Sequence, residues 1–256
     1  MSHPAPVAIV TGGSRGIGLA IGRRLAGAGF ALCIVGRDQR ALDRAVAELS
    51  TRTAVVCVKA DIAEEDEAAR IITAAGELGP VAALINNAAS RGPTALLHEQ
   101  TVAEFREVVD VNLVGTVALT RAVLSGMVAR GTGSIVNIGS IAGVEAYPLR
   151  SAYCATKWAL IGLTRTLAAE YGPSGIRVNL VAPGPTDGEG SAGVVRRRAE
   201  ATGRTVAELT AELTATIPLG RFVTEDETAA TVAFLLSDDA SGITGQSFCV
   251  SGGIEV

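Results

Sequence analysis

The feature that most constrains the fold is an alternation of short apolar runs with longer amphipathic stretches. Seven runs are rich in β-branched residues and almost uninterrupted, as in strands buried on both faces: Val7–Val10, Ala31–Val35, Ala54–Val58, Val81–Ile85, Ser134–Ile138, Ile176–Val181 and Ser247–Val250. Helical patterns separate them: Ile17–Ala28, Arg40–Leu49, Glu64–Leu78, Val102–Ala129, Ala152–Tyr171 and Glu225–Leu236. The sequence therefore predicts an α/β fold of Rossmann type, a doubly wound parallel sheet of about seven strands with helices on both faces.

The chain reads as one unit with one insertion. No low-complexity linker or internal repeat divides the 256 residues, so we expect a single domain over residues 1–256. The composition changes at Pro183–Leu219, which opens with glycine and proline and continues as a charged helical pattern over Val194–Leu213. We interpret residues 184–219 as a lid over a pocket, with a solvent-facing excursion as the alternative.

Composition excludes several classes of function. The chain is 48% apolar with a net charge of −4, which argues against disorder and against a nucleic-acid surface built on bulk charge. No run of eighteen uncharged apolar residues and no secretory signal is visible, so we expect no membrane partner. Four scattered cysteines and two histidines predict no metal site, and they suit a reducing, cytoplasmic location.

A glycine-rich turn follows the first apolar run. The segment Thr11-Gly12-Gly13-Ser14-Arg15-Gly16-Ile17-Gly18 lies between a predicted strand and a predicted helix. Glycines let the backbone approach a ligand closely, and the helix N-terminus favours an anion such as a diphosphate. The spacing is Gly-x3-Gly-x-Gly rather than Gly-x-Gly-x2-Gly. The residues expected to bind a dinucleotide are Gly12, Ser14, Arg15, Gly16, Ile17 and Gly18.

The end of the second strand bears on which dinucleotide binds. An acid there would bind the ribose 2′-hydroxyl of NAD, but the segment is Gly36-Arg37-Asp38. Arg37 and Arg15 are two guanidiniums able to bind a 2′-phosphate, which favours NADP(H). Asp38 is the counter-argument, because a shift of one residue would place its carboxylate near the ribose.

A serine, a tyrosine and a lysine supply candidate chemistry. Ser140 follows a predicted strand, where open α/β sheets bind their ligands, and Tyr153 and Lys157 share one face of a predicted helix. A nearby ammonium lowers the pKa of a phenol, which can then exchange a proton with an alcohol or a ketone. Ser140 is placed to hydrogen-bond the reacting oxygen. The three residues predict proton transfer coupled to the dinucleotide.

These residues, together with Asp61, Asn86-Asn87-Ala88-Ala89, Asn112 and Pro183-Gly184, make the sequence resemble the short-chain dehydrogenase/reductase family over nearly its whole length. The resemblance implies that Tyr153 is the acid/base, that Ser140 orients the substrate and that Lys157 binds the nicotinamide ribose. It implies that Asn112 holds a helix kink and a water. The remaining implied cofactor contacts are Asp61 and Ile62 at the adenine, Asn87 and Ala88 at the ribose, and Pro183, Gly184 and Thr186 at the carboxamide.

Two residues depart from the family pattern. Ala89 stands where the family has glycine, and Thr186 follows the Pro-Gly pair earlier than the family threonine does. The resemblance also implies a homotetramer or dimer, with helix pairs from Val102–Ala129 and Ala152–Tyr171 packed across one axis. We expect such an assembly here.

The sequence favours one function over two others. The first is an NADP(H)-dependent oxidoreductase that interconverts a ketone and a secondary alcohol on a small-molecule substrate, similar to 3-oxoacyl-carrier-protein reductases. The alternatives are an NAD-dependent dehydrogenase of a cyclic diol, hydroxy acid or sugar, and a non-catalytic dinucleotide-binding protein. Arg91, Arg150 and Arg196–Arg198 face either a substrate carboxylate or phosphate, or solvent.

Overall fold

The computed structural model describes residues 5–64 and 66–254, so both ends of the expected domain, 1–4 and 255–256, lie outside the described part. Its seven strands form one parallel sheet in the order β3-β2-β1-β4-β5-β6-β7. The strands are β1 Val7–Thr11, β2 Ala31–Gly36, β3 Val55–Lys59, β4 Val81–Asn86, β5 Gly133–Ile138, β6 Ile176–Pro183 and β7 Ser247–Val250. The predicted fold class is confirmed, and each predicted strand lies within two residues of its observed ends.

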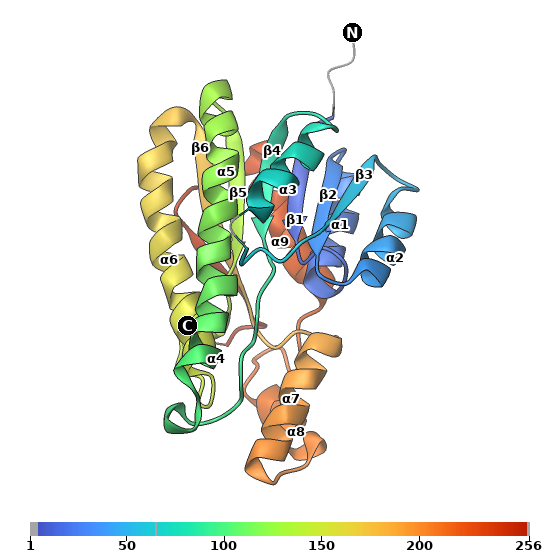
Figure 1. Ribbon diagram of the computed structural model, residues 1–256. Coiled ribbons are helices and arrows are strands. Elements are labelled where there is room, and N and C mark those ends of the chain that lie inside the picture. The colour runs from blue at the N-terminus through green and yellow to red at the C-terminus, as the bar shows by residue number, and fades with distance from the viewer. Residues whose placement is uncertain (1–4, 65, 255–256) are drawn as a thin grey trace.

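Two layers of helices cover the sheet (Figure 1). Helices α1 (Gly16–Gly27), α2 (Gln39–Leu49) and α9 (Glu225–Leu236) pack on one face, whereas α3 (Glu67–Gly76), α5 (Gly115–Arg130) and α6 (Ser151–Tyr171) pack on the other. Strand order reverses between β1 and β4, and at such a reversal we expect a ligand-binding crevice at the carboxyl edge of the sheet. Ligands of such sheets bind in this crevice.

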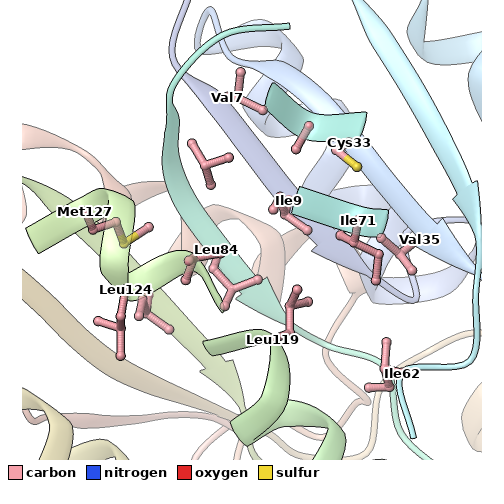
Figure 2. Close-up of a cluster of buried hydrophobic side chains, with 14 of the residues drawn as sticks. Val7, Ile9, Cys33, Val35, Ile62, Ile71, Leu84, Leu119, Leu124 and Met127 are labelled. Atoms are coloured by element: carbon pink, nitrogen blue, oxygen red, sulfur yellow. The ribbon is translucent and has the colours of Figure 1, made fainter. Parts of the chain in front are cut away.

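The second face carries a core that joins strands and helices distant in sequence (Figure 2). Ile9 of β1, Cys33 of β2 and Leu84 of β4 are fully buried there against Leu119 and Met127 of α5. Burial of each large side chain contributes about 1.5–3 kcal/mol. This packing fixes the strand ends that form the crevice.

The predicted helix Val102–Ala129 is interrupted. Helix α4 (Val102–Val109) passes into a π-helical turn at Asp110–Val114 before α5 begins. Among the described residues, the stretch Val102–Arg130 is long and apolar enough to cross a membrane, but half of its most apolar window is buried in the fold. Its apolarity is that of a helix packed in a protein core.

The insertion after β6 forms two helices where the pattern Val194–Leu213 predicted one. Helices α7 (Glu189–Thr202) and α8 (Val206–Ala215) are separated at Gly203, which has a left-handed φ of 65°. Thr205 then caps α8 in a capping box with Glu208. Figure 1 shows the two helices beyond the carboxyl edge of the sheet, and they share a small core of their own.

Candidate active site

The glycine loop is tight because backbone fills the space a side chain would need. Gly12 has a φ of 64°, and a Cβ there would lie 2.8 Å from Asn87 Nδ2. A Cβ at Gly18 would overlap the Gly12 carbonyl oxygen. Asn87 Nδ2 donates to the carbonyls of Thr11 (2.8 Å) and Gly12 (3.2 Å), which ties the loop to the end of β4. Asn87 therefore holds the glycine loop that contains Gly12 and Gly18 against the end of β4.

The N-terminus of α1 is suited to an anion. Among the described side chains none caps α1, which begins at Gly16 after Arg15, whereas Asp38, Thr205 and Thr224 cap α2, α8 and α9. The first N–H groups of α1 are thus left for an outside acceptor. Ser14 and Ile17 complete the loop; Ile17 packs on the core, and Ser14 Oγ lies where a Cβ at Gly36 would approach it to 3.3 Å. This cradle fits the diphosphate of a dinucleotide.

Thr11 begins the glycine-rich turn noted in the sequence, but its role in holding the loop was not predicted. Its hydroxyl accepts hydrogen bonds from the backbone N–H groups of Asn87 (2.9 Å) and Ala88 (3.0 Å) and lies 3.3 Å from the Ile85 carbonyl. A threonine at the end of an apolar strand is the only signal in the sequence for this role. It sets the position of Asn87 and Ala88 beside the glycine loop.

Charged residues cluster at the ends of β2 and β3. Arg37 Nη1 lies 3.3 Å from Asp61 Oδ2 in an exposed ion pair, and Ile62 is buried next to it in sequence. The Asp38 carboxylate accepts a hydrogen bond from Ala41 N (3.2 Å) as the cap of α2. The structure thus brings Arg37 and Asp61 together, which the sequence did not predict, while Asp38 has a structural role.

Ser140, Tyr153 and Lys157 meet at the carboxyl edge of the sheet. Ser140 follows β5 and its hydroxyl accepts from Ala142 N (3.2 Å), which starts a short turn. Tyr153 and Lys157 lie one turn apart on α6, with Lys157 Nζ 5.5 Å from the centre of the tyrosine ring. Lys157 is buried, and its Nζ donates to the Ile138 carbonyl at 2.7 Å. The predicted triad is thus assembled.

The electrostatics differ from the sequence-based expectation in one respect. Burial raises the pKa of the Tyr153 phenol, and a hydrogen bond with Ser140 and the charges of Arg91 and Arg150 act in the opposite direction. Burial also lowers the pKa of Lys157 to about 8. Arg91 and Arg150 are thus further cations beside the phenol, in addition to Lys157, which the sequence predicts there and whose Nζ lies 5.5 Å from the centre of the ring.

Asn112 lies in the π-helical turn and links three elements. Its side chain accepts from Ser90 N (2.7 Å) and donates to the Ser90 carbonyl (2.9 Å) and to Thr156 Oγ1 (3.0 Å). Thr156 precedes Lys157 on α6. The helix interruption expected at Asn112 is present, and Ser90 and Thr156 are its partners that sequence reasoning missed.

The end of β6 leads into the insertion. Pro183 is buried, and Gly184 N donates to the Val250 carbonyl (2.9 Å), so this segment is fixed to β7. Thr186 is buried, and its hydroxyl donates to the Gly184 carbonyl (3.0 Å). Helix α7 also touches the substrate-side loops: Arg91 Nη1 hydrogen-bonds the Gly190 carbonyl, and Arg198 Cζ lies 5.5 Å from the centre of the Tyr147 ring.

Comparison with known proteins agrees with this geometry. Residues 12–255 match a family model described as "Enoyl-(Acyl carrier protein) reductase". The chain is 38% identical over 250 residues to "2-(S)-hydroxypropyl-CoM dehydrogenase 3" of Xanthobacter autotrophicus, covering 97% of this chain and 96% of that protein.

Solved structures superpose over nearly the whole chain. A variant of the actinorhodin polyketide ketoreductase, in complex with NADPH, gives a TM-score of 0.94 at 33% identity and covers 99% of both chains. NAD+-bound xylitol dehydrogenase gives a TM-score of 0.93 at 30% identity, covering 97% of this chain and 98% of that one. The chain belongs to the short-chain dehydrogenase/reductase family, as an oxidoreductase that acts on secondary alcohols or ketones with an NAD(P) cofactor.

Proposed function

We propose that this protein is an NADP(H)-dependent reductase or dehydrogenase that interconverts a ketone and a secondary alcohol, with Tyr153 as its acid/base. The observation that carries the proposal is the meeting of Ser140, Tyr153 and Lys157 at the carboxyl edge that also bears the glycine loop. A protein that only binds a dinucleotide does not need this proton-transfer set.

The side chains have distinct tasks in this proposal. The bound nicotinamide supplies or accepts the hydride. The Tyr153 hydroxyl gives its proton to the forming alkoxide oxygen in reduction, and takes it from the alcohol in oxidation. Ser140 hydrogen-bonds the same oxygen and fixes its position. Lys157 binds the ribose hydroxyls of the cofactor, held at the end of β5 by its bond to Ile138.

Asn112 positions other parts of the site and takes no part in the proton transfer. Through Ser90 it holds the loop after β4, and through Thr156 it holds α6 one residue before Lys157. The cofactor contacts we assign are those expected from sequence: the glycine loop, Asn87 and Ala88, Asp61 and Ile62, and the segment Pro183–Thr186.

The preference for NADP(H) rests on Arg15 and Arg37. Both are exposed at the adenosine end of the crevice, and the competing carboxylate of Asp38 is engaged as the cap of α2. The ion pair between Arg37 and Asp61 is exposed and weak, so a 2′-phosphate can displace it. Binding titrations with NADPH and NADH test this: wild type should prefer NADPH, and Arg37→Asp should reverse the order. A wild-type preference for NADH favours the NAD-dependent alternative, which the xylitol dehydrogenase likeness supports.

The acid/base assignment is tested by removing one hydroxyl. Tyr153→Phe should lower kcat by at least about 10²-fold and leave NADPH affinity within about 2-fold, since general acid–base catalysis contributes roughly 10²–10⁴-fold. The matched control is Tyr171→Phe, which removes a hydroxyl at the far end of the same helix and should keep full activity. Normal turnover by Tyr153→Phe contradicts the proposed mechanism.

We propose further that the chain assembles as a homotetramer or dimer through α5 and α6. A groove of about 460 Å³ runs between these helices and is lined by Leu124, Leu163 and Leu167 among others. Val117 and Val128 on α5 are 41% and 42% exposed. An apolar surface of this kind favours burial against a second copy.

The remaining assignments complete the proposal. Residues 1–256 act as one catalytic domain, with α7 and α8 as the lid at 184–219. The substrate is a small carbonyl or alcohol compound, with no nucleic-acid or membrane partner, and the location is cytoplasmic. Cys33, Cys57, Cys154 and Cys249 are free thiols, as suits a reducing compartment.

A further inference from the structure

A buried, incompletely paired arginine stands beside the proposed acid/base. Arg150 is only 4% exposed, and its Cζ lies 5.1 Å from the centre of the Tyr153 ring. Its Nη2 donates to the Arg91 carbonyl at 2.7 Å, but Nε and Nη1 are buried with no hydrogen-bond partner among the described residues. Leaving guanidinium N–H groups unpaired away from water is costly.

No described carboxylate neutralises this charge. The ion pairs found among the described side chains involve other arginines, and none includes Arg91, Arg150 or Arg197. Burial lowers the pKa of Arg150, and the repulsion of Arg91 and Arg197 acts in the same direction. Several positive charges therefore converge beside Tyr153 without a described anion to offset them.

The backbone next to Arg150 is strained. Leu149 has a φ of 69°, the only left-handed φ among the described residues other than glycine, and this conformation costs roughly 1–2 kcal/mol. The Leu149 carbonyl accepts from Ala95 N at 3.1 Å, which ties the turn to the loop after β4. Buried hydroxyls next to this pair in the chain, those of Thr94 and Ser151, also lack partners among the described residues. Strained backbone and unpaired polar groups together mark a binding site.

We infer that Arg150, with Arg91 at its rim, forms an anion subsite, and that the substrate carries an oxyanion group a few bonds from its reacting carbonyl. This inference rests on the proposed function, because it places the anion relative to Tyr153. A carboxylate, sulfonate or phosphate supplies the acceptors that Nε and Nη1 lack, and its charge offsets the convergent arginines. The subsite sets the distance from anion to carbonyl and so selects the substrate.

Matched substrate pairs test the inference on the wild-type enzyme. The acids 3-oxobutanoate, 4-oxopentanoate and 5-oxohexanoate are compared with their methyl esters, and the best chain length is repeated as sulfonate and phosphonate. We expect one acid to exceed its ester in kcat/KM by at least about 20-fold, as for charge-assisted hydrogen bonds in a desolvated site. Equal values for every acid and its ester overturn the inference, and the ranking of the three anions identifies the preferred one.

Variants then assign the preference to Arg150. Arg150→Met should bring the ratio of kcat/KM for the acid to kcat/KM for the ester close to 1, since any change that it causes in the pKa of Tyr153 acts on both substrates alike, and Arg150→Lys should restore part of the preference. Arg44→Met, an exposed arginine on the opposite face of the sheet, is the matched control and should change neither. An equal loss for acid and ester, or a tenfold loss of NADPH affinity, means that Arg150 serves the fold or the cofactor and overturns the inference.

A binding measurement separates this inference from the proposed mechanism. Calorimetric titration of the NADP+-saturated enzyme with butanoate and with butanamide involves no turnover. Tighter binding of butanoate, lost in Arg150→Met but kept in Tyr153→Phe, supports the subsite whatever the role of Tyr153. Equal binding of the two compounds contradicts it while leaving the acid/base role of Tyr153 standing.

Discussion

Lys157 is an ionisable residue of the candidate site whose burial destabilises its charged form. Its ammonium is buried, and its one described hydrogen bond goes to the Ile138 carbonyl. Burial favours the neutral amine, so its pKa falls to about 8. In the proposed function this buried amine binds the ribose hydroxyls of the cofactor.

The pH dependence of stability follows from this shift. Between about pH 8 and 10.5, Lys157 is protonated in the unfolded protein and mostly neutral in the folded protein. Because the unfolded state binds more protons in this range, the contribution of Lys157 to the free energy of unfolding rises with pH. We expect the wild type to gain about 3 kcal/mol relative to Lys157→Met across this window. Urea unfolding at both ends of the window measures the gain. Lys59→Met removes the exposed lysine at the end of β3, and its free energy of unfolding relative to wild type should not change between these pH values. If the difference between wild type and Lys157→Met is also the same at both pH values, the buried Lys157 does not have the lowered pKa.

At the scale of elements, features with a local signal were predictable from the pattern of residues, and a feature that depends on distant contacts was not. The strands were readable because their buried, β-branched runs are short and continuous. The π-helical turn at Asp110–Val114 was invisible to helical periodicity, because it depends on Asn112 reaching Ser90 and Thr156 across the fold. The break between α7 and α8 was visible locally, in Gly203 and the capping pair that follows it.

The candidate site also has features that were predictable from the sequence and features that were not. Residue types at fixed spacing, such as Tyr153 and Lys157 one helical turn apart, were predictable from sequence together with the family resemblance. The role of Thr11 and the burial of Arg150 were not, because both depend on contacts between segments far apart in the chain. From the sequence, Arg150 was only one of several arginines that could face either a substrate anion or solvent.

Helices α7 and α8 are the lid in the proposed function. Their shared core is small, and their side-chain links to the described loops of the site are chiefly Arg91 to Gly190 and Arg198 to Tyr147. We expect their amides to exchange hydrogen faster than those of α5 and α6, and to slow when NADP+ and substrate bind. Hydrogen-exchange mass spectrometry measures both. Protection equal to that of α6 without ligand contradicts a lid.

At the scale of the whole molecule, the outer face of α5 and α6 is more apolar than a solvated surface requires. Val117 and Val128 line the groove between the two helices and are 41% and 42% exposed. We expect a tetramer or dimer by light scattering, and a smaller species for Val117→Glu because a charge at the interface disfavours association. Val206→Glu on α8, similarly exposed but away from this face, is the control. A monomeric wild type, or no effect of Val117→Glu, contradicts the proposed interface.

These scales meet in one claim, that the sheet brings a dinucleotide cradle and a proton-transfer tyrosine to the same crevice. A crystal structure of the complex with NADP+ measures this most directly. We expect the diphosphate on the Gly12–Gly18 loop and the nicotinamide ring facing the hydroxyls of Tyr153 and Ser140. A diphosphate bound elsewhere, or a nicotinamide turned away from Tyr153, would contradict it.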